Sequence, residues 1–238
     1  MLYSFAGLII DINFKNSFGE KYCERYLYTG TEKADFSVEV SPEMLEQERA
    51  YDIYDSSEGL LECIAAYREI CHRAFEYDCI FMHCSAIAYK NNGILFTAPS
   101  GTGKSTHSAL WTKHFGTDVE VINDDKPLLR AQNGEIFVCG TPWDGKHHRS
   151  TNKMVPVKAI VVLKQGSSNE IRRANKQEAL YHLLNQTIRP DNPEQMNAVL
   201  NMVEKIIKTI PVYHLSCNIS DEAVTTVYEA IKENFNEN

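Results

Sequence analysis

Alternating apolar and polar positions indicate strands in the first 54 residues of the chain. Polar turns separate three apolar stretches, at residues 3–14, 34–40 and 51–54. From there the apolar positions change to helical spacing, at Leu60, Leu61, Ile64, Tyr67, Ile70, Cys71 and Phe75. Asp55 followed by Glu58 resembles a capping box that would start this helix. The pattern therefore predicts a β-rich N-terminal segment plus one helix over residues 1–79.

Two apolar runs follow, at residues 79–89 and 93–98, and "KNNG" joins them with the residue types of a β-hairpin turn. A glycine-rich segment of small residues comes next, at residues 98–106. After it, residues 104–115 predict a helix that Gly116 ends. The middle of the chain therefore predicts a strand, a glycine-rich loop and a helix in succession.

The remaining pattern contains strands first and helices afterwards. Short strands are expected at residues 118–123, 135–140 and 211–217, and a long apolar strand at residues 155–165. Helices are expected at residues 176–187, 193–210 and 220–235. We predict an α/β fold with a mixed sheet, in a single domain over residues 1–238. Its parts are the segment at 1–79, a catalytic core at 80–165 and a mostly helical part at 166–238.

Composition narrows the class of protein. The 238 residues include 24 Lys and Arg against 32 Asp and Glu, a formal net charge of −8. That charge argues against binding nucleic acid or an anionic membrane through bulk charge. No apolar run is as long as a membrane span, so we expect no membrane association. No basic residues precede the N-terminal apolar stretch, so we expect it to be a strand and not a signal peptide. Seven cysteines without a C-x-x-C pair suit a reducing compartment, so we expect a cytoplasmic protein.

The glycine-rich segment, "APSGTGKST", follows the pattern G-x-x-x-x-G-K-[ST] except that Ala98 replaces the first glycine. Pro99 favours an extended conformation at that position, where alanine is tolerated. Small residues allow backbone N–H groups to surround phosphate oxygens at a helix N-terminus. In such loops the lysine reaches the terminal phosphates and the hydroxyl after it binds Mg²⁺. The predicted nucleotide-binding residues are Ser100, Gly101, Thr102, Gly103, Lys104, Ser105 and Thr106. The alternative is a strand-to-helix turn that binds nothing.

A pair of acids, Asp124 and Asp125, ends the short apolar strand 19 residues after Ser105. One carboxylate can hold Mg²⁺ and the other can face a phosphate acceptor. A surface turn before Pro127 is the alternative. Upstream, His83 interrupts an apolar run, and a histidine in that position by itself is more often a core residue.

These residues carry a resemblance to a known family. The segment "HCSAIAYKNNGILFTAPSGTGKST" with the later "NDD" resembles the catalytic domain of HPr kinase/phosphorylase, which phosphorylates a serine hydroxyl. The resemblance is specific over residues 80–130. The glycine-rich segment is also similar to the P-loop of ATP-dependent phosphoenolpyruvate carboxykinase, a structural relative of that family. Because the carboxykinase is about twice as long as this chain, carboxykinase activity is not expected.

The resemblance implies an HPr-kinase-like fold and a role for each matching residue. The loop around Lys104 would bind the phosphates of ATP, and Ser105 with Asp125 would hold Mg²⁺. Asp124 would take the proton of the acceptor, and His83 would lie beside the acid pair. The resemblance also implies a homo-oligomer, although the separate N-terminal domain of the family is missing here.

The glycine-rich signature that the family has after the acid pair is replaced by "GTPWDGKHHRSTNKM". This segment gathers Trp143, Asp144, Lys146, His147, His148 and Arg149. An aromatic face beside a carboxylate and several donors suits a small polyhydroxyl acceptor, and Lys146 or Arg149 could neutralise charge on the transferring phosphoryl group. The alternative is a solvated turn with Trp143 folded into the core.

The sequence thus predicts an ATP- and Mg²⁺-dependent kinase. The leading acceptor is a hydroxyl of a small molecule such as a sugar, and a serine of a peptide or carrier protein is the next candidate. A third hypothesis, from another class, is an ATP-binding sensor module that transfers no phosphoryl group.

Overall fold

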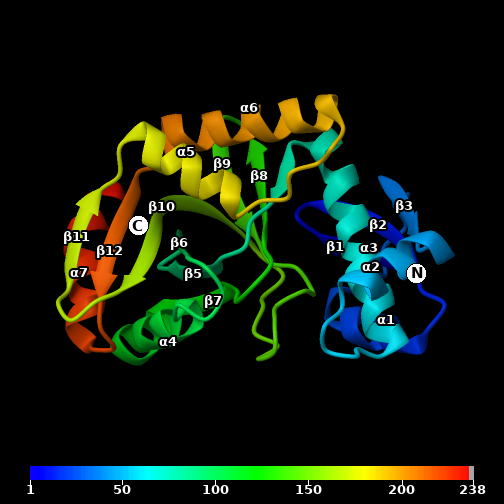
Figure 1. Ribbon diagram of the computed structural model, residues 1–238, viewed down its shortest axis with the longest axis horizontal. Helices are drawn as coiled ribbons and strands as arrows, with labels where there is room; N and C mark the ends of the chain where they lie inside the picture. The colour runs from blue at the N-terminus through cyan, green and yellow to red at the C-terminus, as the bar shows by residue number, and fades with distance from the viewer. Residues whose placement is uncertain (236–238) are drawn as a thin grey trace.

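The computed structural model describes residues 1–235 and contains two β-sheets with helices around them (Figure 1). The last three positions of the predicted 166–238 part lie outside the described residues. Within residues 1–235, no helix has both the length and the apolar character needed to cross a lipid bilayer.

The larger sheet has nine strands. They are β4 (Cys79–Phe81), β5 (Ser85–Tyr89), β6 (Asn92–Thr97), β7 (Val119–Asn123), β8 (Leu128–Gln132), β9 (Glu135–Cys139), β10 (Met154–Gln165), β11 (Glu170–Arg173) and β12 (Val212–Cys217). The order β4-β8-β9-β10-β6-β5-β7 forms the main path, and β12 pairs with β10 and β11. The sheet is mixed, because β6 and β12 run parallel to β10 whereas its other pairings are antiparallel. This confirms the predicted α/β class with a mixed sheet.

Strand β10 joins the two halves of this sheet. Its first residues, Met154–Pro156, pair with β9, and from Val157 onward it pairs with β6. The register shifts between Val157 and Ala159, which is where the strand changes partners. The one long apolar run that the sequence showed therefore serves two partly separate sections of the sheet.

Helices cover both faces of the β6–β10–β12 section (Figure 1). On one face lie α5 (Lys176–Asn185) and α6 (Pro193–Thr209), and on the other α4 (Lys104–Phe115) and α7 (Asp221–Ile231). Successive residues of β10 alternate between the two cores: Ile160 packs with the α5–α6 side and Val161 with the α4–α7 side.

The N-terminal part forms the smaller, three-stranded sheet and three helices. Its elements are β1 (Leu2–Phe5), β2 (Leu8–Asn13), α1 (Ser17–Cys23), β3 (Phe36–Glu39), α2 (Pro42–Tyr51) and α3 (Glu58–Ala74). Short 3₁₀ turns lie at Glu24–Tyr26, Phe75–Tyr77, Gly116–Asp118 and Lys232–Asn234. The core of this part also contains Leu128, Cys139 and Trp143, so the two sheets share buried contacts.

Several local predictions are wrong. Residues 51–54 are not a strand, because Tyr51 ends α2 and the next residues turn around the Asp52 carboxylate, which accepts from the backbone N–H groups of Tyr54 and Ser56. Asp55 does not cap α3. Ser57 does, and its hydroxyl accepts from the backbone N–H of Leu60.

The predicted strand over residues 79–89 is also broken. It splits at residues 82–84 into β4 and β5, which belong to different sections of the sheet. The helices α1 and α2 and the strands β8 and β11 were not predicted. For α2 the signal was present, since Ser41 is the N-cap and Pro42 takes the first helical position.

Candidate functional site

The glycine-rich loop (residues 98–103) connects β6 to α4. Gly101 and Gly103 have φ of +77° and +114°, a region that side chains disfavour, so these two positions require glycine. Gly103 is the N-cap of α4 and provides no side-chain cap. The N–H groups of the first turn of α4 are thus free of a side-chain cap and can bind an anion.

Lys104 crosses this loop, and its Nζ donates to the carbonyl oxygen of Ala98 at 3.1 Å. Ala98 is buried in the core, and its φ is not positive. This backbone conformation does not require glycine, which explains why alanine can occupy the first motif position. Within the loop the Thr102 hydroxyl donates to the Pro99 carbonyl at 2.8 Å.

The acid pair lies within electrostatic reach of this lysine. Lys104 is only 8% exposed, and burial lowers its pKa below the ordinary value. The negative charges of Asp125 and Asp124 act in the opposite direction and favour the charged ammonium. The structure therefore brings together the loop lysine and the two carboxylates that the sequence separated by about twenty residues.

Asp124 is buried and held by two serines that the sequence analysis did not single out. Its Oδ1 accepts from the Ser85 hydroxyl at 2.6 Å, and the Ser85 Oγ lies 2.6 Å from the Ser108 Oγ. Ser108 stands on α4 and Ser85 on β5, so a chain of hydrogen bonds links α4 to Asp124. The available signal was Ser85, a serine in the otherwise apolar strand β5.

His83 lies in the break between β4 and β5, and its ring is fixed on both sides. Its Nε2 lies 3.3 Å from the Asp125 Oδ1, and its Nδ1 lies 3.2 Å from the Oε1 of Gln186. The backbone N–H of His83 also donates to the Gln186 carbonyl at 2.7 Å. The break in the strand frees the histidine from the alternation of the sheet, which is why it reaches the acid pair instead of the core.

The Asp125 carboxyl has a pKa below its ordinary value. Burial alone would raise this pKa, but the hydrogen bond to His83 and the charge of Lys126, whose Nζ lies 3.4 Å from Oδ2, outweigh it. Asp125 is therefore an anion at neutral pH.

Asn123, a buried residue that the sequence analysis left aside, shapes the turn that presents both acids. Its Oδ1 accepts from the backbone N–H groups of Asp125 and Lys126 at 2.9 and 2.7 Å. Its Nδ2 donates to the carbonyl of Thr141 at 3.1 Å. One amide side chain thus fixes the acid pair and attaches it to the loop after β9.

The β9–β10 loop (residues 140–153) lies against the acid pair. The backbone N–H of Asp124 donates to the Arg149 carbonyl at 3.1 Å. A Cβ on Gly145, which has φ +74°, would lie 3.0 Å from the Asp125 Cβ. Glycine is therefore required where the loop passes Asp125.

Two residues of this loop do not have the position that acceptor binding needs, and we correct that expectation. Trp143 is 2% exposed, its Nε1 donates to the Cys63 carbonyl at 2.9 Å, and its ring stacks on Tyr67 with centroids 4.3 Å apart. Asp144 is fully buried, and its Oδ2 accepts from Arg25 at 2.6 Å. Both side chains belong to the core, so neither offers a surface to an acceptor.

The other loop residues remain at the surface. Lys146, His147, His148 and Arg149 are exposed. His148 turns back toward the loop, with its Nδ1 3.4 Å from the Asp144 Oδ1 and its ring edge-on to Tyr22. Contact of Lys146, His147 or Arg149 with a substrate stays a prediction.

The oxygen donors around the loop suit a magnesium ion. Mg²⁺ prefers carboxylate and hydroxyl oxygens and is commonly held by one or two carboxylates together with substrate phosphates. Ser105, on the first turn of α4, and the anionic Asp125 supply such oxygens. The residues present therefore fit the ion that the sequence predicts.

Fold and site together define a mixed α/β protein in which a glycine-rich strand–loop–helix faces a pair of carboxylates. A family model described as "SynChlorMet cassette protein ScmC" matches residues 51–232, and the chain belongs to this ScmC family. No curated protein sequence matches the chain. Among solved structures, the Hpr(Ser) kinase/phosphatase from Coxiella burnetii is similar with a TM-score of 0.35 and 13% identity, over 65% of this chain and 94% of that one. A likeness at this level decides neither fold nor function.

Proposed function

We propose that the protein is an ATP- and Mg²⁺-dependent kinase that phosphorylates a hydroxyl group. The observation that carries this proposal is the convergence of Lys104 and the two carboxylates, with Asp125 held by His83 at 3.3 Å. A phosphate-binding loop by itself serves many proteins. A carboxylate pair within electrostatic reach of the loop lysine is what phosphoryl transfer needs in addition.

Each residue has a defined part in the transfer. The backbone N–H groups of the glycine-rich loop and the Lys104 ammonium bind the phosphates. The acceptor oxygen forms a bond to the γ-phosphorus while the bond to the β–γ bridging oxygen breaks, and ADP leaves. The hydroxyl proton moves to Asp124, whose Oδ1 is occupied by Ser85 and whose Oδ2 forms no hydrogen bond within residues 1–235.

Ser105 and Asp125 would hold Mg²⁺, which would neutralise charge on the phosphates. His83 keeps the Asp125 carboxylate in place and supports its anionic form. Gln186 in turn orients the His83 ring.

A serine hydroxyl of a peptide or carrier protein is the acceptor that we favour over a sugar. Trp143 and Asp144, the two residues that were to stack on and hydrogen-bond a small polyhydroxyl compound, lie in the core. The polar residues left beside the acid pair, Lys146, His147 and Arg149, are exposed. Exposed side chains can contact a hydroxyl that is carried on a larger molecule, such as a peptide. They do not form the enclosed pocket that a sugar needs.

The test offers γ-labelled ATP and Mg²⁺ with separate pools of seryl peptides, carrier proteins and sugars, and follows the label. We expect label on a hydroxyl acceptor with the wild type and none with Lys104→Ala. Lys113→Ala is the matched control, because Lys113 lies on the same helix but is 71% exposed. ATP binding without transfer to any pool would support the sensor hypothesis, and equal transfer by Lys104→Ala would contradict the proposed site.

A further inference from the structure

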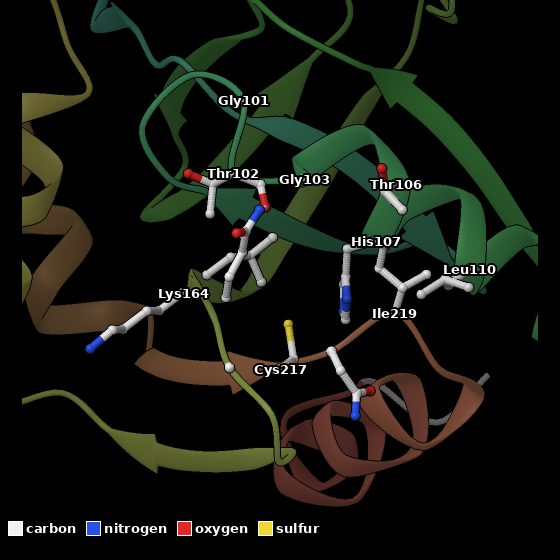
Figure 2. Close-up of a pocket in the computed structure, with 13 residues that line it drawn as sticks. Gly101, Thr102, Gly103, Thr106, His107, Leu110, Lys164, Cys217 and Ile219 are labelled. Atoms are coloured by element: carbon white, nitrogen blue, oxygen red, sulfur yellow. Dashed lines mark hydrogen bonds between the residues drawn. The ribbon is translucent and has the colours of Figure 1, made fainter.

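A cavity of about 470 Å³ opens directly beside the glycine-rich loop (Figure 2). Gly101, Gly103 and Thr106 line it on one side, and the ends of β10 and β12 line it on the other. Gln165, at the end of β10, ties the two sides together, because its Nε2 donates to the Thr102 carbonyl at 3.2 Å. The cavity has the volume of a small-molecule site. Because the loop residues line it, a ligand with its phosphates in the loop has the rest of its body at this cavity.

His107 lines the same cavity and carries an unsatisfied polar atom. The residue is 3% exposed, and its Nε2 accepts from the Trp111 indole N–H at 3.3 Å. Its Nδ1 is buried and has no hydrogen-bond partner within residues 1–235. Burial lowers the pKa of His107 to about 4, so the ring is neutral at pH 7. Since Nε2 is the acceptor, the single ring proton is on Nδ1.

A buried N–H donor without a partner destabilises a protein unless something else uses it. Figure 2 shows the His107 side chain reaching from α4 toward the β12 side of the cavity, where Cys217 lies. His107 is a lining residue of the cavity, so its unpartnered donor lies in the cavity wall, next to a ligand that fills the cavity.

Apolar side chains form much of the remaining lining. Leu110 and Leu163 belong to the walls, and Ile219 lies two residues after the end of β12. Ile219 is 79% exposed, so its side chain is available to pack against a ring bound in the cavity. The lining thus combines apolar side chains and one buried donor with a few polar side chains, Lys164, Gln165 and Asn218 among them. Such a lining suits a flat heteroaromatic ring better than a sugar or a phosphate.

We propose that this cavity binds the base of the nucleoside triphosphate, with the His107 Nδ1–H donating to an acceptor atom of the base and Ile219 covering one of its faces. The inference rests on the proposed function, since it assumes that the phosphates occupy the glycine-rich loop.

Two substitutions of His107 separate the donor from the packing role. Glutamine can keep the acceptor for Trp111 but removes the donor at the Nδ1 position, whereas asparagine keeps a donor there and loses the acceptor. We expect His107→Gln to weaken ATP binding by about tenfold and His107→Asn to weaken it less. Binding of inorganic triphosphate, measured by calorimetry in the same buffer, is expected to be equal in the wild type and both variants. A melting curve of each variant reports any loss of packing.

Ile219 provides an independent test with a matched control. We expect Ile219→Ser to weaken ATP binding by about fivefold, because the residue loses its apolar contact with the base. Ile53→Ser is the control: Ile53 is 82% exposed and lies in the N-terminal part. It is expected to leave ATP binding unchanged.

The outcomes distinguish this inference from the proposed function. If the wild type binds triphosphate as tightly as ATP, or if His107→Gln weakens both equally, the base site is wrong and the proposed kinase stands. An unchanged ATP affinity in both His107→Gln and Ile219→Ser also overturns the base site. If the wild type binds neither ATP nor triphosphate, both proposals fail.

Discussion

The glycine-rich loop and the β9–β10 loop both lie near the acid pair, yet opposite kinds of contact hold them. The glycine-rich loop is held mainly by its own residues, through the glycine conformations at 101 and 103 and the bond from Lys104 to Ala98, six positions away. The β9–β10 loop is held by distant parts of the chain. Trp143 bonds to Cys63, 80 positions away, and Asp144 bonds to Arg25, 119 positions away.

This difference separates the two roles. A loop held locally leaves its N–H groups and its lysine available for a ligand. A loop whose largest side chain and whose carboxylate are both buried serves chiefly to support the acid-pair turn, which it reaches through Asn123 and Gly145. We therefore assign chemistry to the first loop and support to the core side of the second.

The strongest test of the chemical side is Asp124→Asn. Loss of a positioned base typically lowers the rate by about 10²–10⁴-fold. We expect turnover to fall by that factor while ATP affinity and melting temperature stay near the wild type, because asparagine can still accept from Ser85. Single-turnover kinetics and calorimetry measure the two quantities.

Asp125→Asn is the matched variant for Asp124. It should raise the Mg²⁺ concentration needed for half-maximal rate, since Asp125 is the proposed ligand. Unchanged transfer in Asp124→Asn together with a collapse in Asp125→Asn would exchange the two roles.

The supporting side predicts a stability effect at Trp143. Trp143→Ala should lower the free energy of unfolding by about 3–5 kcal/mol, because the ring is buried against Tyr67 and Phe5. Chemical denaturation measures this loss. At a temperature where the variant is folded, its affinity for ATP and the KM for the acceptor should match the wild type. A raised acceptor KM with unchanged stability would restore the stacking role that the core position argues against.

Sequence-based predictions of secondary structure were most accurate where the structure depends on residues that are neighbours in the sequence. The helix 104–115 was predicted at its exact bounds, because a glycine turn precedes it and Gly116, with φ +58°, ends it. The hairpin at residues 89–92 was predicted for the same reason, since Lys90 and Asn91 both take positive φ.

Predictions failed where a residue far away in the sequence determines the local backbone or the position of a side chain. The strand over residues 79–89 breaks at residues 82–84 because the backbone N–H groups of Met82 and His83 donate to the carbonyls of Pro127 and Gln186. Both partners are distant in the sequence, so the apolar run gave no sign of the break. Trp143 could be read as a ligand platform or as a core residue until Tyr67 and Cys63 were placed beside it. Ser85 and Ser108 were not noticed, because only the fold brings both to Asp124.

A smaller effect is expected at the ion pair that anchors the β9–β10 loop. Arg25→Ala leaves the buried Asp144 carboxylate with Ser150 and His148 as its remaining partners. Because the Arg25 side chain is half exposed, we expect a loss of about 1–2 kcal/mol instead of the 3–5 kcal/mol of a fully buried pair.

The double variant Arg25→Ala/Asp144→Asn sharpens this test. It should recover part of the stability lost in Arg25→Ala, because it removes the unpaired charge. A double variant less stable than either single one would mean that Asp144 matters for more than its pairing with Arg25.

The smallest effect concerns pH and the other acid. The pKa of Asp125 is below its ordinary value, because the hydrogen bond to His83 and the charge of Lys126 outweigh burial. A carboxyl with a lowered folded-state pKa contributes stability that is fully present above its unfolded pKa, about 3.9, and is lost as pH falls through the folded value. Lys126→Met removes one cause of the lowering and keeps most of the side chain.

The free energies of unfolding of wild type and Lys126→Met should therefore differ by a constant amount from pH 7 down to about pH 4. Below that the difference should shrink as Asp125 takes up a proton, and denaturant titrations at several pH values follow it. Lys146→Met, on the neighbouring loop where the lysine is exposed, is the control and should show no such pH dependence. A wild-type advantage that persists undiminished at the lowest pH would mean that Lys126 stabilises the turn through its hydrocarbon stem or another partner, and that the charge of Asp125 is maintained by His83 alone.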